Sequence, residues 1–171
     1  MAITFKRCET EDEQARVSLF VLERRRDIDR AFETLNAVTM LYGYLTQGEV
    51  HYGADENGRV VGALGLYLGT PESDFADRHV AFVDMIVLDP ARAGTRTFLN
   101  FLSRMAVYMR ESHPKTTHAT FVAQTGNAYL RRLYAKLAAP IGTRDDASGQ
   151  VTIFSGEISH IGDVLSKYYP V

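Results

Sequence analysis

One acidic residue stands out within the most strand-like stretch of the chain, residues 79–88, HVAFVDMIVL. Side chains of a strand alternate between its two faces, so Asp84 shares a face with apolar residues such as Phe82 and Ile86. Burial between apolar neighbours raises the pKa of a carboxyl group, which makes Asp84 a candidate proton acceptor near neutral pH. The alternative is structural: Asp84 caps a backbone group or pairs with a neighbouring arginine.

The turn after this strand has the composition of an anion-binding loop. Asp89-Pro90 stops the strand, and a helical stretch follows. The residues at the start of that helix are Gly94, Thr95 and Thr97. Free N–H groups and the dipole of a helix N-terminus bind anions, and Arg92 and Arg96 add positive charge. We interpret this turn as a candidate pyrophosphate site, although any strand–loop–helix unit needs polar turn residues.

A second candidate segment is NAYLRRLYAKL, residues 127–137. Asn127 and Tyr134 are separated by about two helical turns and therefore share a face. A phenol held over a cleft can donate a proton to a leaving thiolate. The alternative is that Tyr134 is a core aromatic residue with its hydroxyl at the edge.

Several common sites are disfavoured because their motifs are absent from the sequence. It contains no G-x-x-x-x-G-K-[ST], no G-x-G-x-x-G after a strand and no G-x-S-x-G, which disfavours a P-loop, a dinucleotide fold and an α/β-hydrolase. The single cysteine and the five histidines, none in H-x-x-x-H spacing, make a structural zinc site improbable. We therefore expect no metal.

Composition predicts one intracellular domain spanning residues 1–171. The net charge of -2 disfavours nucleic acid as a partner. No apolar run approaches the about 18 residues of a membrane span, and the N-terminus lacks the apolar core of a secretory signal. The lone Cys8 suits a reducing compartment, and we expect the cytoplasm. We interpret Arg24-Arg25-Arg26 as a solvated helix end rather than a phosphate-binding patch.

Hydrophobic periodicity predicts the element order β-α-α-β-β-β-α-β-α-β. The strands are expected at 3–7, 48–54, 59–68, 79–88, 117–123 and 151–158, and the helices at 10–25, 29–45, 95–111 and 127–138. A capping box of Thr10 and Glu13 opens the first helix. The apolar face of the second is expected to hold Ala31, Phe32, Leu35, Val38, Tyr42 and Leu45. This order indicates an α/β fold with a mixed sheet and helices on both faces.

The two candidate segments together resemble motifs of the GNAT superfamily of N-acetyltransferases, and the resemblance covers most of the chain. DMIVLDPARAGTRTFLNFL resembles the acyl-CoA motif, a strand ending in V-x-P followed by the phosphate loop and a helix. NAYLRRLYAKL resembles the later motif N-x-x-A-x-x-L-Y-x-K-L-G-F, with Leu130 in place of the alanine. Only one strand is evident after the last helix, where relatives usually have two.

The resemblance implies a mostly antiparallel sheet with a splayed parallel pair and an acetyl-CoA site. Backbone groups of Val87 and Leu88 would bond the pantetheine arm, where the strand separates from its neighbour near residues 118–122. The backbone from Gly94 to Thr97 would hold the pyrophosphate. In relatives, the position of Asp84 carries an acid that orients or deprotonates the amine.

The later motif also implies roles. Tyr134 falls on the tyrosine proposed to protonate the coenzyme A thiolate, and Asn127 on an asparagine that contacts cofactor or substrate. The phosphate loop departs from the family pattern, because Ala93-Gly94-Thr95-Arg96-Thr97-Phe98 keeps only the first glycine. Arg96 either crowds the phosphates or replaces an amide contact with a charged one.

We therefore expect an acyl-CoA-dependent N-acyltransferase acting on the amine of a small molecule, peptide or protein. The alternatives are a non-catalytic domain of the same fold and an acyltransferase that uses another donor, such as an acyl-carrier protein. Acids in residues 20–50 and 69–79 would attract a cationic amine, or simply keep the surface soluble; they are Asp27, Asp29, Glu33, Glu49, Glu72 and Asp74. A homodimer edge at strand 151–158 and Tyr168-Tyr169-Pro170 is a weaker prediction.

Overall fold

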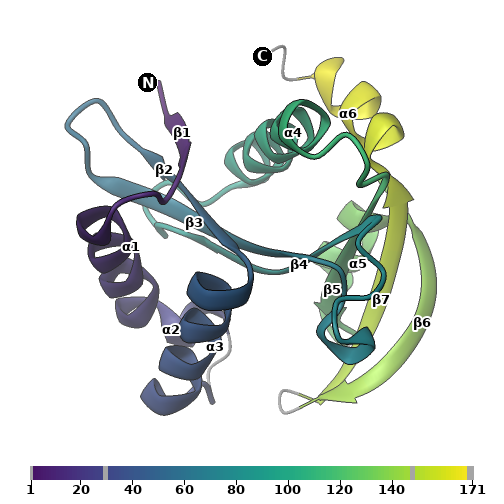
Figure 1. Ribbon diagram of the computed structural model, residues 1–171, viewed down its shortest axis with the longest axis horizontal. Coiled ribbons are helices and arrows are strands. Elements are labelled where there is room, and N and C mark those ends of the chain that lie inside the picture. The colour runs from purple at the N-terminus through teal and green to yellow at the C-terminus, as the bar shows by residue number, and fades with distance from the viewer. Residues whose placement is uncertain (1, 29–30, 147–148, 169–171) are drawn as a thin grey trace. The chain divides into compact units, whose positions relative to one another are not determined.

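The computed structural model describes residues 2–28, 31–146 and 149–168 (Figure 1). The strands are β1 (Thr4–Arg7), β2 (Glu49–Ala54), β3 (Val60–Leu68), β4 (Val80–Leu88), β5 (His118–Gln124), β6 (Ala139–Asp146) and β7 (Gly149–Glu157). The helices are α1 (Glu11–Glu23), α2 (Arg25–Ile28), α3 (Thr34–Gln47), the 3₁₀ helix η1 (Pro71–Ser73), α4 (Thr95–Ser112), α5 (Ala128–Ala135) and α6 (Ile158–Ser166).

Within the described residues the strands form a mixed seven-stranded sheet in the order β1-β2-β3-β4-β5-β7-β6. The pair β4–β5 is parallel, while β1–β2, β2–β3, β5–β7 and β6–β7 are antiparallel. The predicted fold class, a mostly antiparallel mixed sheet with one parallel pair, is confirmed.

The parallel pair stops early, as the resemblance implied. Its register joins Val80–Val83 to His118–Phe121, although β4 continues to Leu88 and β5 continues to Gln124. The separation begins after Phe121, at the far end of the range 118–122 that was predicted. Residues at the end of β4 therefore lie beyond the paired part of the ladder.

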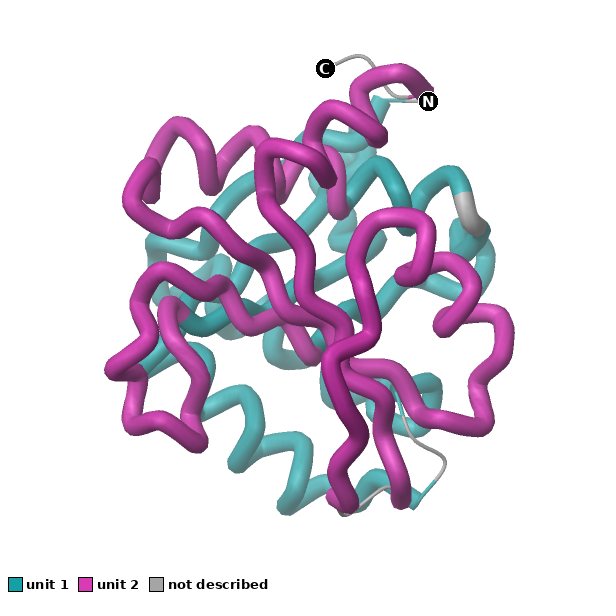
Figure 2. The backbone as a smooth tube through the Cα atoms, turned by 90° about the vertical axis from the view of Figure 1, so that its right-hand side faces the viewer, with its two compact units in different colours: residues 1–67, 85–101 teal, residues 68–84, 102–171 magenta. Residues whose placement is uncertain are grey.

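The chain divides into two compact units (Figure 2). Unit 1 comprises Met1–Tyr67 and Met85–Phe101, and unit 2 comprises Leu68–Asp84 and Leu102–Val171. The boundary falls inside β4 and inside α4, so each of these elements contributes to both units. Each unit is described by itself below, and the expected single domain stays a prediction.

Unit 1 has helices on both faces of its strands, as predicted. A Cβ on Gly62 of β3 would meet the Phe101 ring of α4 at 2.5 Å, and a Cβ on Gly65 would meet the Tyr44 ring of α3 at 2.8 Å. Positions 62 and 65 of a strand face opposite sides. The two glycines therefore let one aromatic ring approach each face closely.

In unit 2, β7 lies between β5 and β6 (Figure 1). The prediction of a single strand after the helix at 127–138 was wrong: β6 supplies the second strand that relatives usually have. It escaped detection because its residues are exposed on both faces, apart from a half-buried Arg144, so it lacks the alternation typical of a strand. Because β7 is an inner strand, the expected dimer edge at 151–158 was wrong too. Tyr169 and Pro170 lie outside the described residues.

Two further expectations about helices were wrong. On α3 the predicted inner residues Leu35, Val38 and Tyr42 are 73%, 45% and 69% exposed, whereas Ala37, Leu41 and Tyr44 are buried. Apolar residues occur around most of this helix, so its periodicity fits more than one face. Asp29, the expected start, lies outside the described residues. Helix α6 was missed, although Ile158, Ile161 and Leu165 recur at helical spacing and are buried.

No helix within the described residues combines the length and apolar character that crossing a bilayer requires.

The capping box at the start of α1 is confirmed and gives a stability prediction. The Glu13 N–H donates to Thr10 Oγ1 and the Thr10 N–H donates to Glu13 Oε2, both at 3.2 Å. Changing Thr10→Ala removes one acceptor and should lower the free energy of unfolding by about 1 kcal/mol, measured by urea denaturation. Thr39→Ala, at an exposed site inside α3, is the control and should not destabilise, because alanine favours helices. Equal losses in both variants would contradict a specific role for the cap.

Candidate functional site

In unit 1, β4 ends in a tight turn built by Asp89 and Pro90. The Asp89 N–H donates to the Val61 carbonyl oxygen at 2.9 Å, and the Arg92 N–H donates to the Asp89 carbonyl oxygen at 2.8 Å. Asp89 Oδ1 accepts from the Ala91 N–H at 3.1 Å. Aspartate followed by proline is a favoured start for such a turn, because the carboxylate bonds a backbone N–H two residues on and proline presets φ.

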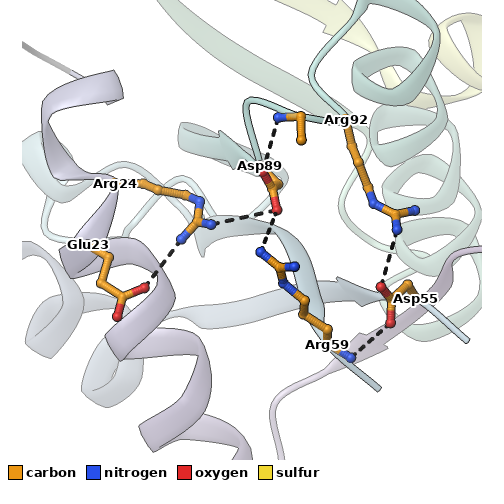
Figure 3. A network of polar contacts seen from close by, with 7 residues as sticks. Glu23, Arg24, Asp55, Arg59, Asp89 and Arg92 are labelled. Carbon is orange, nitrogen blue, oxygen red and sulfur yellow. Dashed lines mark hydrogen bonds and ion pairs between the residues drawn. The ribbon is translucent and has the colours of Figure 1, made fainter. Parts of the chain in front are cut away.

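The other carboxylate oxygen of Asp89 forms ion pairs with two arginines (Figure 3). Oδ2 lies 3.6 Å from Nη2 of Arg24 and 3.4 Å from Nη2 of Arg59. The Asp89 side chain is 8% exposed and that of Arg24 is 17% exposed. The Arg24 guanidinium also lies 4.1 Å from the centroid of the Phe20 ring. A buried carboxylate needs such partners to offset its lost hydration.

This network corrects the interpretation of Arg24-Arg25-Arg26 as a solvated helix end. Arg24 is largely buried and paired, and Nη1 of Arg25 donates to the Leu22 carbonyl oxygen at 2.9 Å in a half-buried position. Arg26 is exposed as expected. The partner of Arg24 lies 65 positions further along the chain, so local charge patterning gave no indication of the ion pair.

Arg92, a predicted cofactor ligand, is paired with a carboxylate of its own unit. Its Nη2 lies 3.3 Å from Asp55 Oδ2 (Figure 3). Asp55 Oδ1 accepts from the N–H groups of Asn57 and Arg59, both at 3.0 Å. Arg92 therefore connects the loop after β4 to the turn between β2 and β3.

The start of α4 has the features of an anion site. The first N–H groups of a helix have no intrahelical acceptor. Gly94 is exposed, a Cβ built there would meet no protein atom within 4 Å, and its φ lies outside the left-handed region. Neither packing nor backbone conformation therefore requires glycine at position 94. Open space here leaves room for a ligand to approach the backbone.

Arg96 is exposed, and within the described part of the chain its side chain makes no hydrogen bond or ion pair. Thr97 is half-buried on the same turn, and Thr95 is the first residue of α4. Of the two arginines predicted to face a phosphate, Arg96 is thus the one whose charge no carboxylate among residues 2–28, 31–146 and 149–168 offsets.

A cavity of about 320 Å³ lies beside this loop, inside unit 1. Its lining consists of Asp27, Ile28, Ile86, Val87, Leu88, Pro90, Ala93 and Phe98. It brings the predicted contact residues Val87 and Leu88 together with the loop that precedes α4. The lining is apolar except for Asp27, which suits an uncharged chain better than a charged group.

Asp84 lies on β4 within unit 2, and the alternation predicted for this strand is confirmed. The positions on its own face range from buried Phe82 to exposed Asp84, whereas the opposite face is buried throughout. Desolvation raises the pKa of Asp84 to about 6, with Arg144 lowering it and Asp146 raising it. The expected burial of Asp84 was wrong, because the residue is exposed on the surface of β4, and the water that reaches it limits how far desolvation raises the pKa.

The arginine that acts on Asp84 comes from β6. The Arg144 guanidinium lies 5.5 Å from the centroid of the Phe82 ring, and it forms an ion pair with Glu72 of η1. Phe82 and Asp84 are two positions apart on the same face of β4. Sequence reasoning missed Arg144 because β6 itself was not recognised.

Tyr134 is a core residue of unit 2. It is 4% exposed, stacks on Phe121 with ring centroids 5.1 Å apart, and contacts Phe154 at 5.8 Å. Burial raises the pKa of its hydroxyl above the ordinary value, so the phenol stays protonated at neutral pH. The ring of Tyr134 is therefore a core aromatic group, as the structural alternative for this residue proposed.

Asn127 is the N-cap of α5, where its Oδ1 accepts from the Leu130 N–H at 3.0 Å. Asparagine is among the favoured N-cap residues, so its place in the motif has a structural explanation beside the functional one.

Asp84, Asn127 and Tyr134 belong to unit 2, and the residues at the end of β4 and the loop belong to unit 1. Within the described residues, no group of three or more His, Cys, Asp or Glu side chains is placed to hold a metal ion.

Solved structures share this arrangement of strands and helices. An acetyltransferase of the GNAT family from Streptococcus pneumoniae matches with a TM-score of 0.64 and 13% identity, over 91% of this chain and 99% of that one. The ribosomal-protein-S18-alanine N-acetyltransferase from Escherichia coli matches with a TM-score of 0.69 and 13% identity, over 92% and 94%. The spermidine N-acetyltransferase from Vibrio cholerae, in complex with CoA and spermine, matches with a TM-score of 0.67 and 11% identity, over 93% and 97%.

No protein-family model and no curated protein matches the sequence. At these low identities the structural likeness establishes the fold, and the chain has the fold of the GNAT N-acetyltransferases. The predicted resemblance is therefore confirmed at the level of the fold.

The open space at Gly94 gives a prediction that separates stability from binding. Gly94→Ala should leave the free energy of unfolding unchanged or raise it by about 0.4–1 kcal/mol, because alanine restricts the unfolded chain. The same change should weaken binding of acetyl-CoA, measured by calorimetry, since the methyl group occupies the approach to the backbone. Gly142→Ala is the matched control, as its Cβ also meets no atom within 4 Å. Undiminished binding by Gly94→Ala would argue against a close approach at this residue.

Proposed function

We propose that this chain is an acyl-CoA-dependent N-acyltransferase, with acetyl-CoA as donor and an amine of a small molecule or peptide as acceptor. The observation that carries the proposal is the start of α4, on a GNAT fold. There an open backbone at Gly94 and the charge of Arg96, which no carboxylate of the described residues offsets, adjoin an apolar cavity. An acyl-CoA combines an anionic pyrophosphate with an uncharged arm that bears the thioester. The start of α4 suits the pyrophosphate, and the apolar cavity suits the arm.

The donor-binding residues belong to unit 1. N–H groups from Gly94 to Thr97 and the side chain of Arg96 would hold the pyrophosphate, because helix N-termini and guanidinium groups both favour phosphate oxygens. Backbone groups of Val87 and Leu88, beyond the paired part of β4, would bond the pantetheine amides beside the cavity. Arg92 contributes less, since Asp55 already offsets its charge.

The donor supplies a thioester whose carbonyl carbon is open to attack by an amine. In the proposed reaction the amine nitrogen forms a bond to that carbon, the carbon–sulfur bond breaks, and the sulfur leaves as a thiolate. Asp84, directly or through a water molecule, accepts the proton that the amine loses. Its raised pKa makes it a better base than an ordinary aspartate while it stays ionised above pH of about 6.

Tyr134 is the proposed proton donor to the leaving thiolate. Its burial keeps the phenol in the protonated form, which a donor requires. A high pKa also makes the phenol a weaker acid, so donation depends on a thiolate that is equally desolvated. The hydroxyl is held in place through the stacked ring, because Phe121 and Phe154 leave it little freedom to rotate.

The acceptor is proposed at the level of an amine. The names of the fold relatives include spermidine and the alanine of a ribosomal protein, so this fold serves acceptors of very different size. Glu72, Asp84 and Asp146 make the surroundings of Arg144 net acidic, which favours a cationic amine. A non-catalytic domain of this fold would bind the donor without releasing thiol when an amine is present.

The role of Asp84 predicts a pH dependence, to be measured as thiol release from acetyl-CoA with a weakly basic acceptor that stays neutral throughout. The rate constant kcat/KM should rise with pH through about 6, as the Asp84 carboxyl loses its proton. Asp84→Asn should lower kcat by about 10²–10⁴-fold, the usual contribution of a general base.

Arg144 supplies the control for this assignment. Its positive charge lowers the pKa of Asp84, so Arg144→Gln should move the rising limb to higher pH, while Arg144→Lys should hold it near its original position. A pH profile that is the same in all these proteins, or an Asp84→Asn variant as fast as the parent protein, would remove Asp84 from the reaction.

A further inference from the structure

The loop between β4 and α4 lacks most glycines of the phosphate-loop motif that the sequence resembles. Its sequence from Ala93 to Phe98 contains one glycine, yet the loop must present its N–H groups in a defined direction to bind phosphate. Glycine permits unusual backbone angles, so a loop that lacks it must be fixed by other contacts. Those contacts converge on the residue at which the loop begins.

Asp89 joins three parts of unit 1 through one carboxylate. Oδ1 closes the turn by accepting from the Ala91 N–H at 3.1 Å. Oδ2 receives Arg24, which follows α1, at 3.6 Å and Arg59, which precedes β3, at 3.4 Å (Figure 3). The turn therefore cannot shift without breaking an ion pair to a helix or to a strand.

Burial makes this attachment strong. The Asp89 side chain is 8% exposed, and only Arg59, at 69%, extends into solvent. Removing one partner of a buried ion pair leaves the other charge uncompensated, so the network resists displacement more than a surface pair would. A second attachment, from Arg92 to Asp55 at 3.3 Å, secures the loop three residues further on.

We propose that Asp89 is a positioning residue: with Arg24 and Arg59 it fixes the loop before α4 in the orientation that binds the phosphates of the donor. This inference rests on the proposed function. Asp89 itself is turned toward the two arginines and touches no reacting atom, so its effect passes through the N–H groups of the loop. Its loss should therefore weaken donor binding and leave the rate at saturating donor nearly unchanged.

Two substitutions at Asp89 separate the turn contact of Oδ1 from the ion pairs of Oδ2. Asp89→Asn keeps an oxygen for the Ala91 N–H and removes the charge that Arg24 and Arg59 require, whereas Asp89→Ala removes both. We expect acetyl-CoA to bind at least about fivefold more weakly to Asp89→Asn, and more weakly still to Asp89→Ala, because small displacements of positioning groups have large effects. Calorimetric titration gives the dissociation constants, and steady-state kinetics should show a raised KM for the donor at nearly constant kcat.

Arg59→Met tests the same ion pairs from an exposed position, where the fold tolerates change, and should raise the donor KM in the same direction. If the two changes act through one contact, their combined effect with Asp89→Asn should be smaller than the sum of the separate effects. Glu23→Gln is the control: Glu23 contacts Arg24 at 3.5 Å, is 61% exposed and does not reach the loop. Its donor KM should equal that of the parent protein.

The outcomes are distinct. If the parent protein fails to bind acetyl-CoA, the proposed function fails and this inference fails with it. If the parent binds while Asp89→Asn and Arg59→Met, both folded by circular dichroism, bind equally well, the positioning role is wrong and the proposed function stands. Should Asp89→Asn not fold, an unchanged donor KM in Arg59→Met would by itself overturn the inference, and a raised KM would support it.

Discussion

A buried carboxylate at the end of β4 must be compensated by positive charge, and the geometry of unit 1 around the loop reflects that constraint. The Asp89 side chain is 8% exposed, and Arg24, Arg59 and a backbone N–H lie close enough to offset the lost hydration of its carboxylate. Meeting this requirement draws the end of α1 and the turn before β3 to the same point. These contacts fix the position of the loop that starts there, as the proposed binding of phosphate requires.

The proposed phosphate loop also departs from the glycine-rich motif that the sequence resembles. Glycine-rich loops let a backbone approach phosphate because they lack side chains. Here one glycine, Gly94, keeps that open approach, while Arg96 adds a charge that a glycine could not supply. Phe98, at a position where the resembled motif has glycine or alanine, lines the neighbouring cavity.

Sequence reasoning succeeded where burial follows a regular period. Strand β4 alternates as expected, and the capping box of Thr10 forms. It failed where the period is ambiguous or absent. Helix α3 carries apolar residues around most of its circumference and buries a different face, and β6 is exposed on both sides.

For the candidate site, local sequence identified the segments and missed the contacts that hold them. The position of Asp84 on β4 and the start of α4 follow from alternation and turn composition. The ion pairs of Asp89 with Arg24, and of Arg144 with Glu72, join residues far apart in the chain, and nothing in either local sequence specifies the partner. Tyr134 and Asn127 have structural roles, in the core and at a helix cap, that a functional motif does not reveal.

The central claim is that the start of α4 binds the phosphates of an acyl-CoA, and the most direct test is calorimetric titration of the purified protein with acetyl-CoA. The parent protein should bind with a dissociation constant in the micromolar range, and Arg96→Ala should bind about tenfold more weakly, as expected for loss of one charge-assisted hydrogen bond. Arg78→Ala, an exposed arginine on the loop before β4, is the control and should bind like the parent. No binding at millimolar acetyl-CoA, or equal binding by all three proteins, would contradict a donor site at this position.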